Sequence, residues 1–182
     1  MLVVAEHEQM PVQGARAGEP EAWDFVFKRY QLPLYIYVFE LVHDEQASLD
    51  IVQETFINAA RYVGGLREDG KFGSWLFGIA HQKCIQHWRK RRPEQVSLAE
   101  EDGEFADADA GPREMLIRKE QEEEFVNAIA QLPVPQRAVL LLHCVEDFSL
   151  EEIAGITGTP IGTVKSRLHY AKKALRGLLK QK

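Results

Sequence analysis

The chain has 182 residues, of which 45% are hydrophobic and 27% charged, and its formal net charge is −6. This length is enough for one ordinary domain or two small ones, and the average apolar content excludes an intrinsically disordered chain. The two cysteines, far apart in sequence, provide no disulfide framework, which suits a reducing cytosol. The longest apolar run, at 32–42, is too short to span a bilayer, and the first ten residues do not resemble a signal peptide. We therefore expect a cytoplasmic protein without membrane insertion.

The first half of the chain is predicted to be helical, because no segment shows the alternation of a β-strand. After an N-terminal extension of residues 1–19, helices are expected over 21–30 and 33–42, with a break near Leu32-Pro33. A third helix is expected over 47–63, where apolar residues recur on one face. These residues are Leu49, Val52, Phe56, Ala60 and Val63.

A glycine-rich loop at 64–73 leads to a fourth predicted helix at 74–92, which ends in the basic run HWRKRR. Cations interleaved with aromatic residues suit single-stranded DNA, because phosphates attract cations and exposed bases stack on rings. The candidate DNA-binding residues of this part are Arg67, Lys71, Phe72, Lys83, Trp88, Arg89, Lys90, Arg91 and Arg92. The alternative is that Phe72, Trp75 and Trp88 are core aromatic residues.

The acidic residues are concentrated in the middle of the chain. Residues 93–124 carry 3 basic and 12 acidic groups, whereas residues 125–182 carry 8 basic and 4 acidic groups. The stretch 93–112 contains few large apolar residues and lies between prolines, which predicts a flexible acidic linker. Further helices are expected over 113–131 and 135–146. The expected fold is therefore all-α, with two small helical domains at 20–92 and 113–182.

Residues 149–175 have the pattern of a helix-turn-helix. Ser149 and Glu152 match a capping box that opens the first helix. Gly158 suits a left-handed turn, and Thr159 can cap the second helix. From residue 160 to 182 there are seven Lys and Arg residues and no Asp or Glu. The second helix is therefore of the kind that enters the major groove of DNA.

The helical wheel of this second helix separates its apolar and polar sides at about 100° per residue. The apolar stripe comprises Ile161, Val164, Leu168, Ala171 and Leu175. The residues that point the opposite way, and that are expected to meet base edges, are Ser166, His169, Tyr170 and Lys173. The cations that flank them, and that are expected to meet phosphates, are Lys165, Arg167, Lys172 and Arg176. The alternative is a solvated basic helix that closes a small bundle.

Three segments together resemble a known family. The segments DIVQETFINAARYV (50–63) and DGKFGSWLFGIAHQKCIQHWRKRR (69–92) resemble region two of bacterial sigma factors of the extracytoplasmic-function (ECF) class. The segment at 132–175, which contains the helix-turn-helix, resembles region four. The resemblance implies a dissociable subunit of bacterial RNA polymerase. Region two would bind the polymerase clamp and open the −10 promoter element, and region four would read the −35 element as duplex. It also implies an anti-sigma factor as a partner.

The resemblance further implies roles for particular residues. On the third helix, Asp50, Gln53 and Glu54 match the contact with core polymerase. The 64–73 loop matches the segment that captures a flipped base of the non-template strand, and the HWRKRR end matches the helix that meets the upstream edge of the −10 element. The residues that fall in the −35-binding helix are Thr163, Lys165, Ser166, Arg167, His169, Tyr170 and Lys173. Tyr170 stands where members often carry Arg or Lys, and Gln82 where they often carry Asn, so no promoter consensus is carried over.

Two weaker patterns favour plainer explanations. His81, Cys84 and His87 invite a metal site, but the two histidines diverge by about 120° on a helix and no fourth ligand is near. His143 and Cys144 invite a thiol nucleophile, but neighbours on a helix point in different directions. We expect no enzymatic activity, no cofactor and no metal. The other functions considered are a stand-alone helix-turn-helix regulator that binds operator DNA without polymerase, and an enzyme or RNA-binding protein built on a helical bundle.

Overall fold

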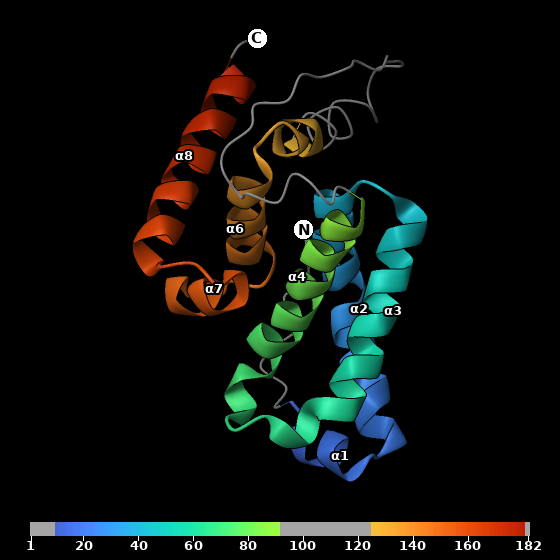
Figure 1. Cartoon of the computed structure of the whole chain (residues 1–182). Helices are drawn as coiled ribbons and strands as arrows, with labels where there is room; N and C mark the ends of the chain where they lie inside the picture. The colour runs from blue at the N-terminus through green and yellow to red at the C-terminus, as the bar shows by residue number, and fades with distance from the viewer. Residues whose placement is uncertain (1–9, 92–124, 181–182) are drawn as a thin grey trace, which may run out of the picture. The chain divides into compact units, whose positions relative to one another are not determined.

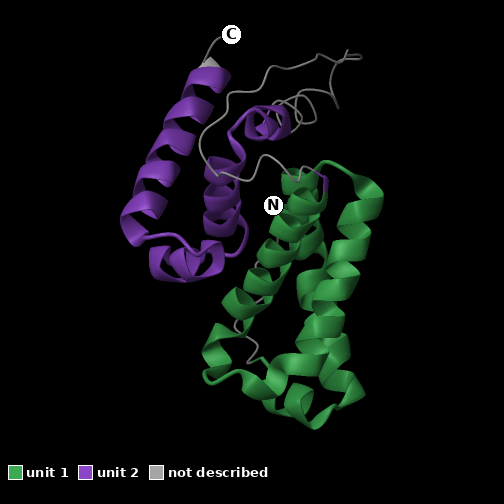
Figure 2. Cartoon of the chain, in the orientation of Figure 1, with its two compact units in different colours: residues 1–90 green, residues 91–182 purple. Residues whose placement is uncertain are grey.

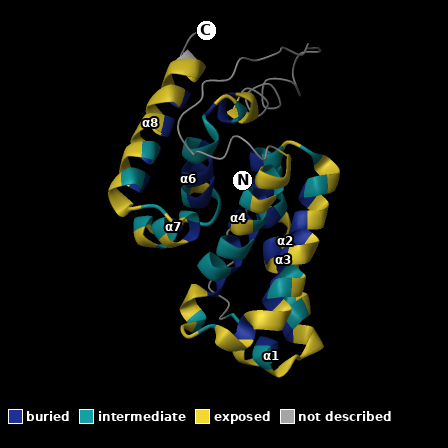
Figure 3. Ribbon diagram, viewed as in Figure 1, coloured by how far each residue is buried: buried dark blue, intermediate teal, exposed yellow. Residues whose placement is uncertain are grey.

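The structure is a computed structural model that describes residues 10–91 and 125–180. Within these two ranges all regular secondary structure is helical, as the sequence predicted. The chain divides into two compact units, residues 1–90 and 91–182 (Figure 2). Each unit has its own buried core (Figure 3), and each is described by itself.

Unit 1 contains α1 (Val12–Ala17), α2 (Pro20–Val42), α3 (Glu45–Tyr62) and α4 (Phe72–Arg91) (Figure 1). The chain turns after α2 through His43, which has a left-handed backbone with φ of 51°. Asp44 then caps α3, because its carboxylate accepts a hydrogen bond from the backbone N–H of Ala47 at 2.9 Å. The returning helix α3 packs alongside α2. The rings of Tyr37 and Phe77, with centroids 5.5 Å apart, join α2 to α4 in the core.

The predicted break near Leu32-Pro33 is wrong, because α2 continues through Pro33 to Val42. A proline inside a helix has no N–H to donate to the carbonyl four residues earlier, which costs about 3 kcal/mol. On either side of Pro33 the buried positions stay in register on one helical face. They are Val26, Tyr30, Leu34, Tyr37, Val38 and Leu41. Burial of each such side chain contributes roughly 1.5–3 kcal/mol, so the packing of this face outweighs the defect.

The predicted buried face of the third helix is confirmed for Val52 and Val63, which are buried, and Phe56 is half-buried, but the prediction is wrong for Leu49 and Ala60. Leu49 is 48% exposed and Ala60 is exposed, whereas α3 buries Ser48, Ile51, Val52, Thr55 and Ala59. The two hydroxyl side chains satisfy themselves inside the helix. Ser48 donates to the carbonyl of Asp44 and Thr55 donates to the carbonyl of Ile51, each at 2.7 Å. Because such bonds remove the penalty of burial, small polar residues can face the core where a hydrophobic pattern places them outside.

Between α3 and α4 the chain forms two short 3-10 turns, η1 (Val63–Gly65) and η2 (Asp69–Lys71). Helix α4 begins at Phe72, two residues earlier than predicted, and its basic end is described as far as Arg91. The remaining cation of that run, Arg92, lies outside the described residues, as do the predicted linker at 93–112 and most of the predicted helix at 113–131.

Unit 2 contains α6 (Val134–Val145), α7 (Leu150–Thr157) and α8 (Ile161–Lys180), preceded by a helical stretch at 125–130. Helix α6 corresponds to the predicted helix at 135–146, and it packs against both α7 and α8. The core of the unit includes Val139 and Leu142 of α6, Ile153 of α7 and Val164 of α8, all fully buried. This three-helix core supports the helix-turn-helix, and it sets which side of α8 faces solvent.

Candidate nucleic-acid and polymerase interfaces

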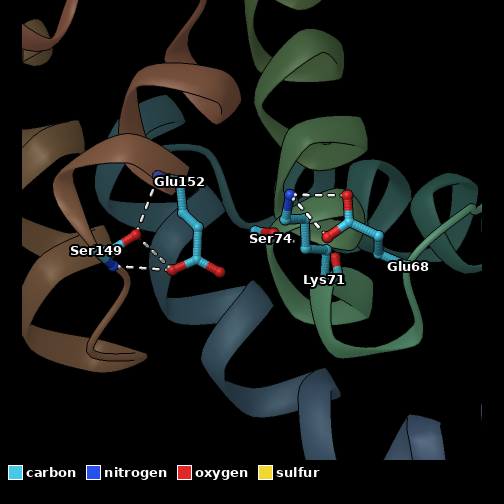
Figure 4. A network of polar contacts seen from close by, with 5 residues as sticks. All are labelled: Glu68, Lys71, Ser74, Ser149 and Glu152. Atoms are coloured by element: carbon cyan, nitrogen blue, oxygen red, sulfur yellow. Dashed lines mark hydrogen bonds and ion pairs between the residues drawn. The ribbon is translucent and has the colours of Figure 1, made fainter.

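The start of α7 has the capping box that the sequence predicts (Figure 4). The Ser149 hydroxyl accepts a hydrogen bond from the backbone N–H of Glu152 at 3.2 Å, and the Glu152 carboxylate accepts one from the backbone N–H of Ser149 at 2.9 Å. This reciprocal capping box begins α7. Gly158 ends α7 with φ of 63°, a left-handed conformation that side chains disfavour. The hydroxyls of Thr157 and Thr159 lie 2.9 Å apart across the turn. Together these contacts fix the start of α8.

Helix α8 buries one side and exposes the other. Val164, Leu168, Ala171 and Leu175 of the predicted stripe are buried, and Ile161 lies at its edge with 36% exposure. The residues predicted to point outward are exposed: Ser166, His169, Tyr170 and Lys173. The flanking cations Lys165, Lys172 and Arg176 are exposed too. The basic side of α8 is therefore turned to solvent, where a duplex can approach it.

Three side chains of α8 are more constrained than the wheel indicates. Arg167 is partly buried, and this burial lowers the pKa of its guanidinium, which still remains charged at neutral pH. Thr163 is half-buried, and its carbonyl accepts a hydrogen bond from the Ser166 hydroxyl at 3.0 Å. The Ser166 hydroxyl thus already donates its proton within α8, while its oxygen can still accept a hydrogen bond from another group. Thr163 and Arg167 lie at the margin of the exposed face rather than at its centre.

Most of the cationic residues predicted to bind the −10 element have side chains that face solvent. Arg67, Lys71, Arg89, Lys90 and Arg91 are all exposed. The ammonium of Lys71 contacts the Glu68 carboxylate at 2.9 Å (Figure 4) on a largely exposed surface, where such a pair is weak. The exposed cations thus form two groups, one on the loop before α4 and one at the end of α4.

The aromatic residues of this region belong mainly to the core. Phe72 is 1% exposed, and its ring centroid lies 6.0 Å from that of Tyr30 and 5.7 Å from that of Trp75. Trp75 and Trp88 are half-buried. For Phe72 the structure supports the alternative, namely that the ring is a core aromatic residue. A ring packed in this way is not free to stack on a base.

The exposed face of α3 carries the three residues that match a polymerase contact, because Asp50, Gln53 and Glu54 all face solvent. The corrected packing of α3 adds apolar surface to this face. Leu49 and Ile57, 48% and 49% exposed, lie on the solvent side of α3 together with these polar residues. The solvent side of α3 therefore combines exposed apolar side chains with polar and acidic ones.

An ion pair joins two residues that the sequence assigned to different partners. The Lys83 ammonium of α4 donates to the Glu54 carboxylate of α3 at 2.7 Å. This hydrogen bond and the positive charge of Lys83 hold the pKa of the Glu54 carboxyl below its ordinary value. The Lys83 side chain is only 12% exposed, so it is bound within unit 1 rather than displayed to DNA. Residues 29 positions apart gave no sequence signal of this contact.

Sequence reasoning also missed helix α1, which was treated as an extension. The Arg16 guanidinium lies 2.6 Å from the Asp69 carboxylate and donates to the Leu66 carbonyl, also at 2.6 Å. The Gln13 amide donates to the second carboxylate oxygen of Asp69 at 3.0 Å. Helix α1 is therefore attached to the loop that precedes α4. A six-residue helix has too few turns to show a hydrophobic period, so only Gly18 at its left-handed end marks it in the sequence.

The residues that invited a metal site or a nucleophile have other surroundings. Tyr37 Oη and His81 Nδ1 lie 2.8 Å apart in the core. Burial raises the pKa of the Cys84 thiol to about 12, and partial burial also raises the pKa of Cys144. Both thiols are therefore protonated at neutral pH and are weak nucleophiles. Within 10–91 and 125–180, no three His, Cys, Asp or Glu side chains are grouped so as to hold a metal ion. The helices described in these ranges also include none with the length and apolarity to cross a bilayer.

Comparison with known proteins gives the same division of the chain. Residues 26–94 match the model of Sigma-70 region 2, and residues 122–175 match the model of Sigma-70, region 4. The chain is 34% identical over 192 residues to the RNA polymerase sigma-H factor of Pseudomonas aeruginosa, covering 99% of this chain and 100% of that protein. It is 30% identical to the ECF RNA polymerase sigma-E factor of Escherichia coli, with 92% of each covered. The sigma factor RpoE of Bartonella quintana, solved in complex with the anti-sigma factor NepR, is similar with a TM-score of 0.63 and 26% identity, covering 87% of this chain and 98% of that one.

Unit 1 is thus a sigma region 2 bundle, and unit 2 carries the sigma region 4 helix-turn-helix. The chain belongs to the ECF sigma factors of the sigma-70 family, and it directs promoter-specific initiation by RNA polymerase. This assignment accounts for a helix-turn-helix preceded by a helical unit rather than by a receiver or ligand-binding domain. The stand-alone regulator is therefore not favoured.

Proposed function

We propose that the exposed side of α8 reads the −35 element in the major groove, and that unit 1 binds core polymerase and opens the −10 element. The observation that carries the proposal is the division of α8 into a buried apolar stripe and a basic, polar face turned to solvent. Ser166, His169 and Tyr170 supply hydroxyl and ring groups that can contact base edges. Tyr170, 57% exposed, has its ring against that of His169, with centroids 5.6 Å apart. The two rings thus form one contact surface.

The cations beside this row position the helix on the duplex. Lys165, Lys172 and Arg176 are exposed, and they can neutralise phosphates on either side of the groove. Arg167 is partly covered by its own unit, so its charge acts from the margin. Lys173 lies among the outward residues, where it can reach a base or a phosphate. Affinity then depends on the cations and sequence preference on the outward polar row.

In unit 1 we assign the single-stranded −10 contacts to the exposed cations, which are Arg67, Lys71, Arg89, Lys90 and Arg91. Arg92 continues the same run in sequence. Trp88 is half-buried and can offer a ring edge beside these charges. Phe72 and Lys83 are left out of this face, because the ring of Phe72 is packed in the core and the ammonium of Lys83 is bound to Glu54. Both act by holding α4 in place.

The solvent face of α3 is assigned to core polymerase. Asp50, Gln53 and Glu54 supply polar contacts, and Leu49 supplies apolar area that an isolated chain leaves in water. Covering Leu49 by a partner removes apolar surface from solvent, so docking is favourable without a change in the fold. We further propose that an anti-sigma factor covers one or more of these faces when the protein is inactive. A similar sigma factor, RpoE, is known in such a complex. The site of action is then the cytoplasm, where the polymerase works, and the chain has no catalysis of its own.

Reconstitution with a bacterial core polymerase tests the proposal. Promoter DNA is first selected from a random duplex library by the purified chain bound to core. We expect the selected DNA to support initiation by the holoenzyme and not by core alone. Tight, sequence-specific binding to DNA without core, together with no initiation in its presence, would instead identify a stand-alone regulator.

A further inference from the structure

Helix α1 and the loop before α4 together enclose a pocket in unit 1. Its volume is about 550 Å³, which falls in the range of roughly 300–1,000 Å³ found for ligand sites. Met10, Pro11 and Gln13 line it from the side of α1. Asp69, Gly70 and Gly73 line it from the loop, and the rings of Tyr30 and Phe72 complete it. Three of its eight lining residues therefore precede position 26, where the match to region 2 begins.

The loop itself has little to define its shape. Four of the ten residues at 64–73 are glycines, which lose more backbone freedom than other residues when they become ordered. Within the loop, the turns are closed by short-range backbone bonds from Leu66 to Val63 and from Lys71 to Glu68. Such bonds shape each turn but do not tie the loop to the bundle. A longer-range constraint is needed if the pocket is to keep one geometry.

Helix α1 supplies such a constraint at one carboxylate. Asp69 accepts from Arg16 through one oxygen and from Gln13 through the other, at 2.6 and 3.0 Å. The same guanidinium also holds the Leu66 carbonyl at 2.6 Å. These bonds connect positions 50 or more residues apart, and they are charge-assisted, which makes them stronger than neutral ones.

Helix α1 is itself a firm support. Val12 and Ala15 are buried, and the Trp23 indole of α2 donates to the Ala15 carbonyl at 3.1 Å. Gly14 allows a close approach, since a side-chain carbon there would lie 3.0 Å from Ala22 of α2. The constraint on the loop is thus transmitted from the core of unit 1 through α1.

We propose that α1 positions the 64–73 loop for an unpaired base of the non-template strand. Arg16 acts as a positioning residue through Asp69, and Gln13 acts as a specificity-determining residue at the pocket. This inference rests on the proposed function of the loop in −10 binding. The pocket suits the hydrogen-bonding edge of a nucleobase, because Gln13 and Asp69 place an amide and a carboxylate in its lining, while the buried rings of Tyr30 and Phe72 form part of its wall. Recognition of the −10 element then depends on residues that lie before the region 2 match.

The test uses holoenzyme and a fluorescein-labelled single-stranded oligonucleotide that carries the non-template −10 sequence selected by the wild-type holoenzyme. Each position of that sequence is also replaced by the other three bases. We expect Arg16→Ala to weaken binding of the selected oligonucleotide about tenfold, and Gln13→Ala to reduce discrimination among the four bases at one position. Affinity for core polymerase and for a duplex −35 fragment should stay unchanged. The exchanged pair Arg16→Asp with Asp69→Arg should recover part of the loss, and Lys28→Ala is the matched control.

The outcomes separate the inference from the function on which it rests. If the wild-type holoenzyme does not discriminate among bases in any single-stranded oligonucleotide, the proposed function of the loop and this inference both fail. If the wild type discriminates and Arg16→Ala and Gln13→Ala do so equally well, the inference alone is overturned. A uniform loss of affinity for all bases in both variants would also overturn it, because that result indicates general destabilisation of unit 1. Selective loss at one position, with partial recovery in the exchanged pair, supports it.

Discussion

Removing the exposed cations of α8 should change how DNA binding responds to salt without changing which sequence is preferred. Lys165, Lys172 and Arg176 are exposed beside the outward polar row, where each can contact one phosphate. Loss of one phosphate contact reduces the slope of log K against log salt by about 0.9. For Lys165→Ala, the ratio of wild-type affinity to variant affinity should therefore fall about 3.5-fold as salt rises from about 50 to 200 mM. Removing all three cations should reduce the slope by about 2.7.

Changes in the outward row should have the opposite signature. Ser166→Ala and Tyr170→Phe remove hydroxyl groups and no charge, so the salt slope should stay as in the wild type. The preference among base pairs at the contacted positions should change by about 1–3 kcal/mol. The measurement is fluorescence anisotropy of holoenzyme with duplex −35 fragments at several salt concentrations, with Lys28→Ala as the charge-matched control in unit 1. If Ser166→Ala reduced the slope as much as Lys165→Ala does, the division of α8 into phosphate and base positions would be refuted.

Three further results are expected from the contacts within each unit. Ser149→Ala removes the hydroxyl that caps α7, which should lower the free energy of unfolding of unit 2 by about 1 kcal/mol in urea titrations; an unchanged midpoint would contradict the role of the cap. In the native protein, the exposed Cys144 should react with iodoacetamide well before Cys84 does, because Cys84 is fully buried and its pKa is raised to about 12. Mass spectrometry of the alkylated chain measures the order of reaction. Because the pKa of Glu54 is lowered, its pairing with Lys83 stabilises unit 1 at pH values above the ordinary pKa of a glutamate, and this stabilisation is lost as pH falls through the lowered pKa. Glu54→Gln should therefore reduce the acid dependence of the free energy of unfolding. An identical pH profile in the variant would argue against the pair.

The helix-turn-helix could be predicted from sequence because its determinants are local. A capping box spans four residues, a left-handed glycine is a property of one residue, and the stripe of α8 repeats over about four turns. Signals of this kind do not depend on what the rest of the chain does. The same holds for α6, whose continuous apolar run lies on a helix buried on most of its surface.

The features that sequence reasoning got wrong depend on partners distant in the chain. Pro33 was read as a break since its local effect is unfavourable, and only the packing of both halves of α2 on one core reverses this. Ser48 and Thr55 do not appear in a pattern of apolar residues, yet both are buried, because their hydroxyls are satisfied by their own helix. With these two residues on the buried face, Leu49 is exposed. Which face is buried depends on the packing of α3 against α2, and the pattern of residues within α3 carries no record of that contact.

The candidate site shows the same contrast. Exposure of the outward residues of α8 follows from its wheel, whereas the position of Phe72 in the core does not follow from a run of cations and aromatic residues. Charge patterns predict where phosphates can bind, but they do not tell which cation is already paired. Lys83 and Arg16 were given no intramolecular partner from sequence, and each is bound to a carboxylate at least 29 residues away.

Placing the two DNA faces in separate units has a consequence for how the chain distinguishes a promoter from other DNA. Each face offers a short helix or loop, so each alone is expected to bind weakly, and the sequence between them is acidic, with 3 basic and 12 acidic residues at 93–124. Acidic residues repel the phosphates of nearby DNA, so we expect the free chain to bind any duplex weakly. Once core polymerase holds both units, the second contact becomes intramolecular and gains from a high effective concentration. Recognition then requires both promoter elements at the spacing that the polymerase imposes, and neither unit needs high affinity by itself.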